Sequence, residues 1–361
     1  MLKPLINIIV LETMASPEII YSVERIREKV LENIQRLGSV EFEEGINWYS
    51  EDSYEKSFVV GVDSSYTSRI YKYVYLYLIR GVAVPYGDHT GLKRCLVSDS
   101  DSDAHFIAVP AYETEELTGP VPPPVRELKK ILSHRAKDLE INVGHRSYEC
   151  VKEIVGEEPL VMMDGSARGF IPYRFKEREI RRGFPLIEEL RKSWESRIEI
   201  IKDLSSRDDL VFISKTQTRT YLSQKLTPYI RVNEEKLKIL VPDVFLLNLY
   251  LTKKNIFREG IRAPGFTEPV IYENPDPPMT ITIFYAVFER GGGMFQISVV
   301  GRKDLGIVKE IYRRIRYWSP GGYPEPLREA HHFSRLRYND FIKLLYLSGI
   351  YIESGREVLE T

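Results

Sequence analysis

Two aspartates in this chain each follow a short apolar run and precede small residues. Asp63 ends the segment FVVGVD, and Asp164 ends the segment PLVMMD. A carboxylate at the end of a buried strand costs several kcal/mol unless it is paired or binds a cation. Because hard divalent cations prefer oxygen ligands, the two acids indicate a metal site. Metal-assisted hydrolysis of a phosphodiester is the chemistry that such a site favours.

Three further residues could act beside these acids. Lys215 ends the apolar run LVFISK, where its ammonium could neutralise a phosphate oxygen. Tyr323 and His331 lie in the segment GYPEPLREAHH, and the tyrosine hydroxyl could bond a phosphate oxygen or a water on the metal. His331 and His332 are adjacent, so on a helix they point about 100° apart and cannot both face one site. The spacing from Tyr323 favours His331.

The elements that would position these residues follow from the apolar spacing. Short apolar or alternating runs predict five strands, over residues 58–63, 70–86, 104–112, 159–164 and 210–215. A period near 3.6 predicts helices over 17–37, 124–155, 183–204, 307–318 and 326–349, and a hairpin is expected across Gly291–Gly293. We expect SSYTS, which follows Asp63, to be a turn. We expect Asp99–Asp103 to be a solvated acidic loop, because it lacks the glycine and glutamate of a calcium loop.

The order of these elements resembles a ribonuclease H-like fold, with acids on the first strand, the first helix of the core and the fourth strand. Within that fold, the segments GVDSS, MMDGS, FISK and GYPEPLREAH resemble the NurA nuclease family of archaea and bacteria, in the same order along the chain. The resemblance extends from about Phe58 to Leu336. It implies an α/β protein with a mixed central sheet flanked by helices, and with helical additions at both ends.

The resemblance also implies an activity and a set of partners. Asp63, one helical carboxylate, Asp164 and His331 would bind two divalent ions, manganese or magnesium, with Lys215 and Tyr323 beside them. The chain would be a deoxyribonuclease that cuts single strands internally and degrades single- and double-stranded DNA from 5′ to 3′ during end resection at double-strand breaks. It would act as a homodimer docked on a HerA-type hexameric ATPase, in the cytoplasm at the nucleoid.

The identity of the helical carboxylate stays open between Glu149 and Glu140, with Glu153 as a third option. Glu149 is favoured by its placement, because it lies near the end of the 124–155 helix and shortly before Asp164. A carboxylate near that end should approach the acids at the ends of the strands. A break near Gly144 would change this order.

Composition limits the other classes of function. The 361 residues carry 51 basic and 52 acidic side chains, so the net charge of −1 excludes a uniformly basic, histone-like binder. Cys95 and Cys150 form no CxxC motif, which disfavours a zinc knuckle and a disulfide framework and is typical of an intracellular protein. No apolar run reaches the roughly 18 residues of a membrane span, and no signal peptide is expected.

Two kinds of contact surface are predicted. Arg313, Arg314, Arg316 and Tyr317 combine positive charge with an aromatic ring, which is typical of DNA binding, although a solvated charged helix face is the alternative. The amphipathic helix over 17–37 and the apolar segment FIKLLYLSGIYI are candidates for docking the ATPase. The corresponding domain division is an N-terminal extension over 1–55, a nuclease domain over 56–340 and a tail over 341–361.

Two rival interpretations remain open. One is a different ribonuclease H-like nuclease, such as a resolvase or an RNA-directed enzyme. The other is an inactive scaffold that only docks on an ATPase. The joint presence of Asp63, Asp164 and His331 argues against a scaffold, because a decayed site usually loses a ligand.

Overall fold

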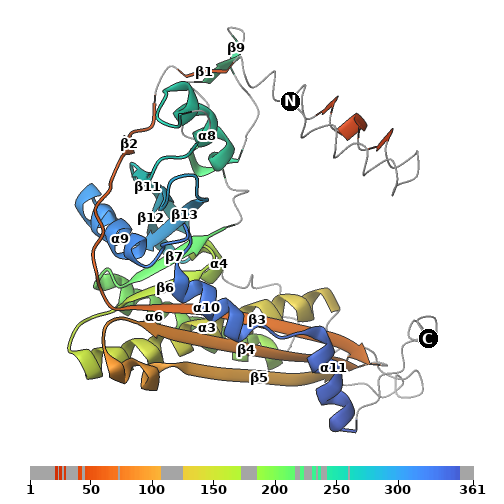
Figure 1. Ribbon diagram of the computed structural model, residues 1–361. Coiled ribbons are helices and arrows are strands. Elements are labelled where there is room, and N and C mark those ends of the chain that lie inside the picture. The colour runs from red at the N-terminus through yellow and green to blue at the C-terminus, as the bar shows by residue number, and fades with distance from the viewer. Residues whose placement is uncertain are drawn as a thin grey trace, which may run out of the picture. The chain divides into compact units, whose positions relative to one another are not determined.

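The chain forms two compact units in this computed structural model (Figure 1). The structure describes residues 21–22, 24–26, 28–29, 40–42, 45–71, 74–106, 125–171, 185–215, 220–222, 230–232, 235–236, 242–258 and 261–349. The smaller unit combines Met1–Ile46 with Thr218–Tyr250, and the larger combines Asn47–Gln217 with Leu251–Thr361. The predicted boundaries at 55 and 340 differ from this division, because a middle segment of the chain groups with the N-terminal one.

In the smaller unit, three short strands form a sheet. β1 (Val40–Phe42) pairs antiparallel with β8 (Ile230–Val232), which pairs antiparallel with β9 (Glu235–Lys236). α8 (Asp243–Lys253) begins in this unit. Of the helix predicted over 17–37, the described residues between 21 and 29 are helical, and the remainder lies outside the described part.

In the larger unit, the described residues form a ten-stranded mixed sheet with the order β2-β10-β12-β13-β7-β6-β3-β4-β5, and β11 pairs with β12 outside this path. The strands are β2 (Trp48–Tyr49), β3 (Val59–Tyr71), β4 (Val74–Tyr86), β5 (Val97–Phe106), β6 (Leu160–Asp164), β7 (Leu210–Ser214), β10 (Gly265–Thr267), β11 (Val270–Pro275), β12 (Pro278–Val287) and β13 (Met294–Val300). The helices are η1 (Thr90–Cys95), α3 (Val125–Val155), α4 (Ala167–Phe170), α6 (Pro185–Ser206), α9 (Leu305–Tyr317), α10 (Glu325–Ser334) and α11 (Tyr338–Leu347). The predicted hairpin is confirmed as β12 and β13.

The five strands β5-β4-β3-β6-β7 form the ribonuclease H-like part of this sheet. β4 runs antiparallel to both of its neighbours, whereas β3, β6 and β7 are parallel. In chain order α3 connects β5 to β6, and α6 precedes β7. The predicted α/β class, with a mixed sheet flanked by helices, is therefore confirmed.

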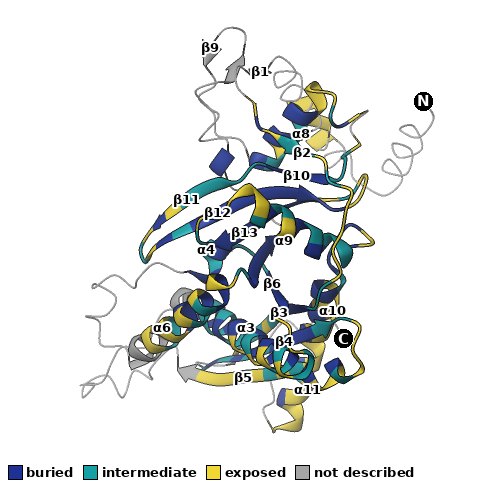
Figure 2. Ribbon diagram, turned by 90° about the vertical axis from the view of Figure 1, so that its left-hand side faces the viewer, coloured by how far each residue is buried: buried dark blue, intermediate teal, exposed yellow. Residues whose placement is uncertain are grey.

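Helices cover both faces of this part of the sheet (Figures 1 and 2). On β4, Tyr75, Tyr77 and Ile79 pack against α3, whereas Val82 and Val84 pack against Ala330 of α10. Successive side chains of a strand point to opposite faces, so α3 and α10 lie on opposite sides of β3 and β4. A residue on β3 can therefore face α10 while its neighbour faces α3.

The region after Asp63 differs from the prediction. SSYTS is part of β3, which continues to Tyr71, and is not a turn. The acidic run is also a strand, β5, and not a loop. Asp99 pairs with Arg146 at 2.9 Å, and Asp101 pairs with Arg135 at 3.3 Å. The alternating acids therefore lie on the face that contacts α3, and ion pairs with that helix offset the weak strand propensity of aspartate.

The last predicted helix, over 326–349, is divided in two. α10 ends at Ser334 and α11 begins at Tyr338. In α11, Phe341 and Leu345 are buried against Leu76 and Leu78 of β4. Part of the apolar C-terminal segment thus belongs to the core, while Leu347 is 85% exposed. In the described part of the chain, no helix is long and apolar enough to cross a membrane.

The two cysteines form a disulfide, contrary to the expectation from the sequence. Cys95, at the end of η1, is joined to Cys150 of α3, with a Cα–Cα distance of 5.4 Å. The two residues are 55 apart in the chain, so their spacing did not reveal that η1 packs on α3. Closing a loop of this length restricts the unfolded chain.

Removal of this disulfide should lower thermal stability. In the chain-entropy model, a loop of this length contributes about 4 kcal/mol, which corresponds to a fall in Tm of roughly 5 °C for a chain of this size. Thermal unfolding of Cys95→Ala/Cys150→Ala, compared with wild type with and without reductant, measures the effect. If the oxidised and reduced wild-type proteins unfold at the same temperature, the disulfide does not contribute.

Candidate metal centre

Asp63 lies in the middle of β3 and points to the face that α10 covers. Its side chain is 9% exposed. His331 of α10 places Nδ1 2.7 Å from Asp63 Oδ2, and the backbone N–H of Ser64 donates to Oδ1 at 2.8 Å. Burial raises the pKa of Asp63, as does the nearby Asp164, and the bond with His331 partly offsets this rise. Burial and the charge of Asp164 thus disfavour the ionised form of Asp63 unless a positive charge compensates.

A glycine allows α10 to come this close. Gly61 precedes Asp63 by two residues and therefore faces the same side of β3. A Cβ at Gly61 would lie 2.2 Å from the carbonyl carbon of Pro326, in the first turn of α10. This approach lets the helix extend along β3 so that His331, further along α10, reaches Asp63. Gly61 in FVVGVD therefore permits the approach of α10 that brings His331 to Asp63.

Asp164 joins Asp63 and His331 in one cluster. Each of the three side chains offers a ligand atom, and these atoms all lie within 4.8 Å of one another. Asp164 ends β6, which is parallel to β3 and next to it in the sheet. Three of the residues predicted to bind metal therefore meet in the structure, although they come from a strand interior, a strand end and a helix.

The helical carboxylate beside this cluster is that of Glu140, which is 6% exposed. One oxygen accepts a hydrogen bond from the hydroxyl of Ser64, the residue after Asp63. Burial, together with the smaller effect of the charges of Asp63 and Asp164, raises the pKa of Glu140 to about 7, in spite of Lys137 and Ser64. Its other oxygen, Oε2, is buried and has no hydrogen-bond partner among the described residues.

Glu149, the favoured candidate from the sequence, does not lie in the cluster. It is nine residues after Glu140 in α3, and nine residues make about two and a half helical turns, so the two side chains point to opposite sides. The Glu149 side chain is 52% exposed and lies 3.7 Å from His145 Nε2. Of the three candidates on α3, Glu140 is therefore the one that lies beside Asp63, through its bond to Ser64, although the cluster found among the described residues contains only Asp63, Asp164 and His331. Glu153, four residues after Glu149 and on the same side of α3, gains no support.

Lys215 and Tyr323 lie beside the acids, as the motifs suggested. Lys215 Nζ donates to Asp164 Oδ2 at 2.8 Å and lies 4.4 Å from the centre of the Tyr323 ring. Burial raises the pKa of Tyr323 far above its usual range, and Asp164 and Asp63 raise it further. The tyrosine hydroxyl therefore stays protonated as a donor, and it is buried with no hydrogen-bond partner in the part of the chain that the structure describes.

The donor set suits a divalent cation. Carboxylate oxygens with one imidazole nitrogen are ligands that manganese accepts. The buried Oε2 of Glu140 and the hydroxyl of Tyr323 lack hydrogen-bond partners in the described structure. Burying a polar atom without a partner is costly, unless an ion, a water or a substrate binds to it. If Nδ1–H of His331 donates to Asp63, Nε2 keeps its lone pair for a cation.

The predicted DNA-binding arginines of α9 are engaged within the protein. Arg314 is buried, lies 3.8 Å from Asp209, and donates to the carbonyl of Glu158. Arg313 pairs with Glu51, and Arg316 donates to the carbonyls of Glu51 and Phe288. These side chains therefore hold neighbouring segments in place. Tyr317 remains at the surface and contacts Tyr54.

Comparison with known families decides what kind of protein has this arrangement. Residues 58–336 match the model of the NurA domain. The chain belongs to the NurA family. The matched region begins just before β3 and ends just after α10, so it contains Asp63, Glu140, Asp164, Lys215 and His331.

Individual relatives agree with this assignment. The DNA double-strand break repair nuclease NurA of Saccharolobus solfataricus is 33% identical over 112 residues, which are 30% of this chain and 32% of that protein. This alignment thus spans about a third of the curated relative.

Solved structures show the same fold over nearly the whole chain. The NurA nuclease from Sulfolobus solfataricus superposes with a TM-score of 0.62 at 19% identity, covering 93% of this chain and 97% of that one. A NurA structure with manganese gives 0.57 at 16% identity, covering 91% and 98%. A NurA structure with dAMP and manganese gives 0.51 at 14% identity, covering 99% of each chain.

Proposed function

We propose that this chain is a metal-dependent DNA nuclease that acts in the repair of double-strand breaks. The observation that carries this proposal is the cluster of Asp63, Asp164 and His331, whose ligand atoms lie within 4.8 Å of one another. Membership of the NurA family and the curated name of the Saccharolobus solfataricus relative support it. Acids and an imidazole at this spacing fit phosphodiester hydrolysis with a bound cation.

Asp63, Glu140, Asp164 and His331 would hold the cations. Manganese is the proposed ion, because two related structures contain it, and two ions per site is the proposed number. When bound, divalent cations lower the pKa of a water and stabilise charge on the leaving oxygen. Their positive charge would also offset the repulsion and burial that raise the pKa of Asp63 and Glu140.

The other residues would act on the phosphate. The ammonium of Lys215 lies next to Asp164, so it could also contact a phosphate bound beside that acid. The ammonium would then counter charge on the non-bridging oxygens. The Tyr323 hydroxyl, protonated and unpartnered within the described ranges, would donate to a phosphate oxygen. Asp63 would fix the ring of His331 through the bond to Nδ1.

The finer features of the activity are also proposals. We infer internal cutting of single strands and 5′-to-3′ degradation of single- and double-stranded DNA, in end resection at the nucleoid. The inferred partners are a HerA-type hexameric ATPase and a second copy of the chain. Light scattering with and without the ATPase tests both, and a monomer that never binds the ATPase would contradict them.

The activity is tested with end-labelled single- and double-stranded DNA. The full-length protein should degrade both in manganese and be inactive in chelator, and the position of the label should report 5′-to-3′ polarity. A preference for branched DNA or RNA–DNA hybrid would instead indicate a resolvase or an RNA-directed enzyme. If calorimetry detects no binding of manganese and no substrate is cut with the ATPase present, the chain is a scaffold.

A further inference from the structure

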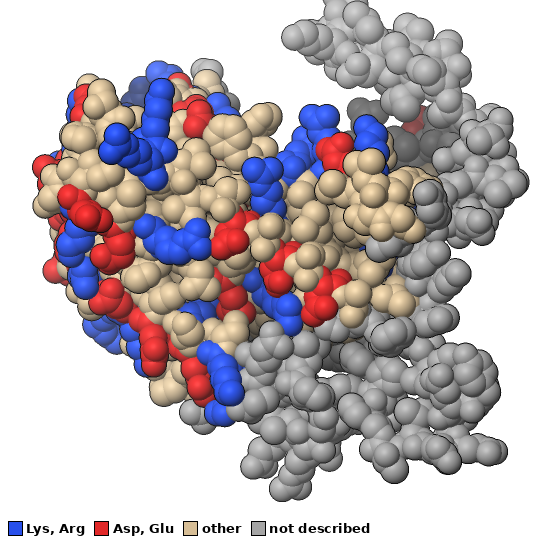
Figure 3. All heavy atoms as spheres, turned by 90° about the horizontal axis from the view of Figure 1, so that it is seen from below, with Lys and Arg blue, Asp and Glu red and all other residues tan. Residues whose placement is uncertain are grey.

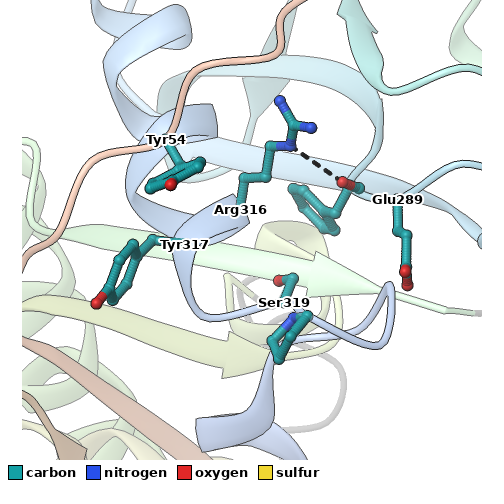
Figure 4. Close-up of a pocket in the computed structure, with 7 residues that line it drawn as sticks. Tyr54, Glu289, Arg316, Tyr317 and Ser319 are labelled. Atoms are coloured by element: carbon teal, nitrogen blue, oxygen red, sulfur yellow. Dashed lines mark hydrogen bonds between the residues drawn. The ribbon is translucent and has the colours of Figure 1, made fainter.

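A pocket of about 460 Å³ lies at the C-terminal end of α9, outside the metal cluster (Figure 4). Its walls come from the end of α9, the turn after β12, the loop that leads to α10, and the extended segment before β3. The lining residues are Tyr54, Phe288, Glu289, Arg316, Tyr317, Ser319 and Pro320. This volume lies within the range of sites for small ligands, and a nucleobase would fit inside it.

Two aromatic rings form one side of the pocket (Figure 4). The rings of Tyr54 and Tyr317 lie 5.8 Å apart at an angle of 47°. Tyr317 packs edge-on against Trp318 at 4.9 Å, and Trp318 Nε1 donates to the carbonyl of Ser57 at 2.9 Å. Tyr54 is 66% exposed. The pair thus combines a fixed ring with an accessible one, which is the arrangement of a stacking platform for a flat ligand.

The arginines of α9 hold this platform together. Glu51, three residues before Tyr54, pairs with Lys309 at 2.7 Å and with Arg313 at 3.4 Å. Arg316 donates to the backbone carbonyl of Glu51. Burial alone would raise the pKa of Glu51, but bonds from Lys309 and Ser53 and the charge of Arg313 lower it to about 2. The segment that carries Tyr54 is therefore anchored to α9 by charge at any ordinary pH.

A carboxylate on the other side of the pocket favours a base over a phosphate. Glu289 is exposed, and among the described residues no cation lies within ion-pair distance of its carboxylate. Arg316 also lines the pocket, but its guanidinium already donates to the backbone carbonyls of Phe288, drawn as a dashed line in Figure 4, and of Glu51. A free carboxylate repels phosphate but accepts hydrogen bonds from the amino group of a base.

The pocket is connected to the metal centre by direct packing. Glu289 Oε2 lies 3.6 Å from the position that a Cβ would take on Gly322, the residue before Tyr323. Phe288 stacks on Phe295 at 5.8 Å, and Phe295 contacts the Tyr323 ring at 5.4 Å. The ring of Phe288 in the pocket wall is therefore linked through the ring of Phe295 to Tyr323, which lies beside the metal cluster.

We propose that this pocket binds an unpaired nucleobase of a single DNA strand whose phosphate lies at the metal centre. The base stacks on the exposed ring of Tyr54, beside Tyr317, and its exocyclic amino group donates to Glu289. This inference rests on the proposed nuclease function. It also gives the structure a way to prefer unpaired strands, because a base held in a duplex cannot enter the pocket without leaving its stack.

The test uses single-stranded oligonucleotides that carry fluorescent 2-aminopurine at one position each, bound to the full-length protein in chelator. Wild type should quench the fluorescence strongly at one position in the strand, because stacking quenches this base. Tyr54→Ala should remove that quenching and weaken binding about tenfold. Tyr54→Phe, which keeps the ring, should retain both, and Tyr338→Ala, a change of an exposed tyrosine on α11, should behave as wild type.

The binding result is independent of cleavage. Equal quenching by wild type and Tyr54→Ala, or quenching at no position, overturns the base site even if the protein cuts DNA. Quenching that depends on Tyr54 supports the base site even if no cleavage occurs in manganese, and in that case only the nuclease proposal fails. An abasic position at the quenched site should remove the difference in affinity between wild type and Tyr54→Ala.

Discussion

Replacing Asp63 or Asp164 by asparagine is expected to reduce metal-dependent DNA cleavage by about 1,000-fold or more. A bound cation contributes several kcal/mol to stabilising the transition state, and each 1.36 kcal/mol is tenfold in rate. Each of these aspartates supplies a ligand atom to the cluster with His331. An amide of the same shape keeps one acceptor oxygen but removes the charge that attracts the cation.

The fold should survive the change at Asp63. Burial and the neighbouring Asp164 raise the pKa of Asp63, so its ionised form is disfavoured in the folded protein without a cation. Removing that charge should leave the Tm without metal unchanged or slightly higher. Manganese should raise the Tm of wild type and not that of Asp63→Asn, because a ligand that binds only the folded state stabilises it.

A matched control is Asp88→Asn. Asp88 is exposed and pairs with Lys56, and a surface ion pair contributes little to stability. This variant should cut DNA at the wild-type rate and keep the shift of Tm with manganese. Cleavage by Asp63→Asn at the wild-type rate would remove Asp63 from the metal centre.

Much of the site was predictable, because its main residues follow recognisable patterns. Asp63 and Asp164 each end an apolar run, and the spacing of Tyr323 from His331 identified the histidine that reaches Asp63. The structure joins these three segments through the parallel pairing of β3 with β6 and the packing of α10 on β3. Parallel pairing and helix packing are long-range contacts, which the motifs implied only by resemblance to a family.

Other features depended on partners that lie far away in the sequence. The acidic run before residue 104 forms an edge strand because Arg135 and Arg146 of α3 pair with its aspartates. The arginines of α9 resemble a DNA-binding stripe, yet Glu51, Asp209 and several carbonyls already occupy them. A charge in a sequence does not reveal whether its partner is a substrate or another part of the chain.

Glu140 shows that the side of a helix on which a residue lies determines which neighbours it contacts. Glu140 falls in line with the buried side chains of α3 at intervals of three and four residues, which are Leu128, Leu132, Ala136, Val143, Ser147 and Val151. A carboxylate in such an apolar stripe is costly to bury without a partner. This pattern was visible in the sequence and outweighs proximity to the end of the helix, the criterion that favoured Glu149.

Glu140→Gln and Glu149→Gln should therefore have opposite outcomes, although both change one glutamate of the same helix. Glu140→Gln should reduce cleavage by about 100-fold or more and weaken the stabilisation of the protein by manganese, because a ligand charge is lost. Glu149→Gln should stay within about twofold of wild type, because its side chain is half exposed and its neighbour is His145.

Stability without metal provides an independent readout for the same pair. Burial raises the pKa of Glu140 to about 7, so near neutral pH the folded protein holds a partly ionised, buried carboxyl. A neutral amide should remove this cost, so the Tm of Glu140→Gln without metal should rise relative to that of wild type as pH increases from about 4.5 to about 7, and the difference should stay constant above pH 7. Loss of cleavage in Glu149→Gln with normal cleavage in Glu140→Gln would mean that α3 presents its opposite face to Asp63 and Asp164.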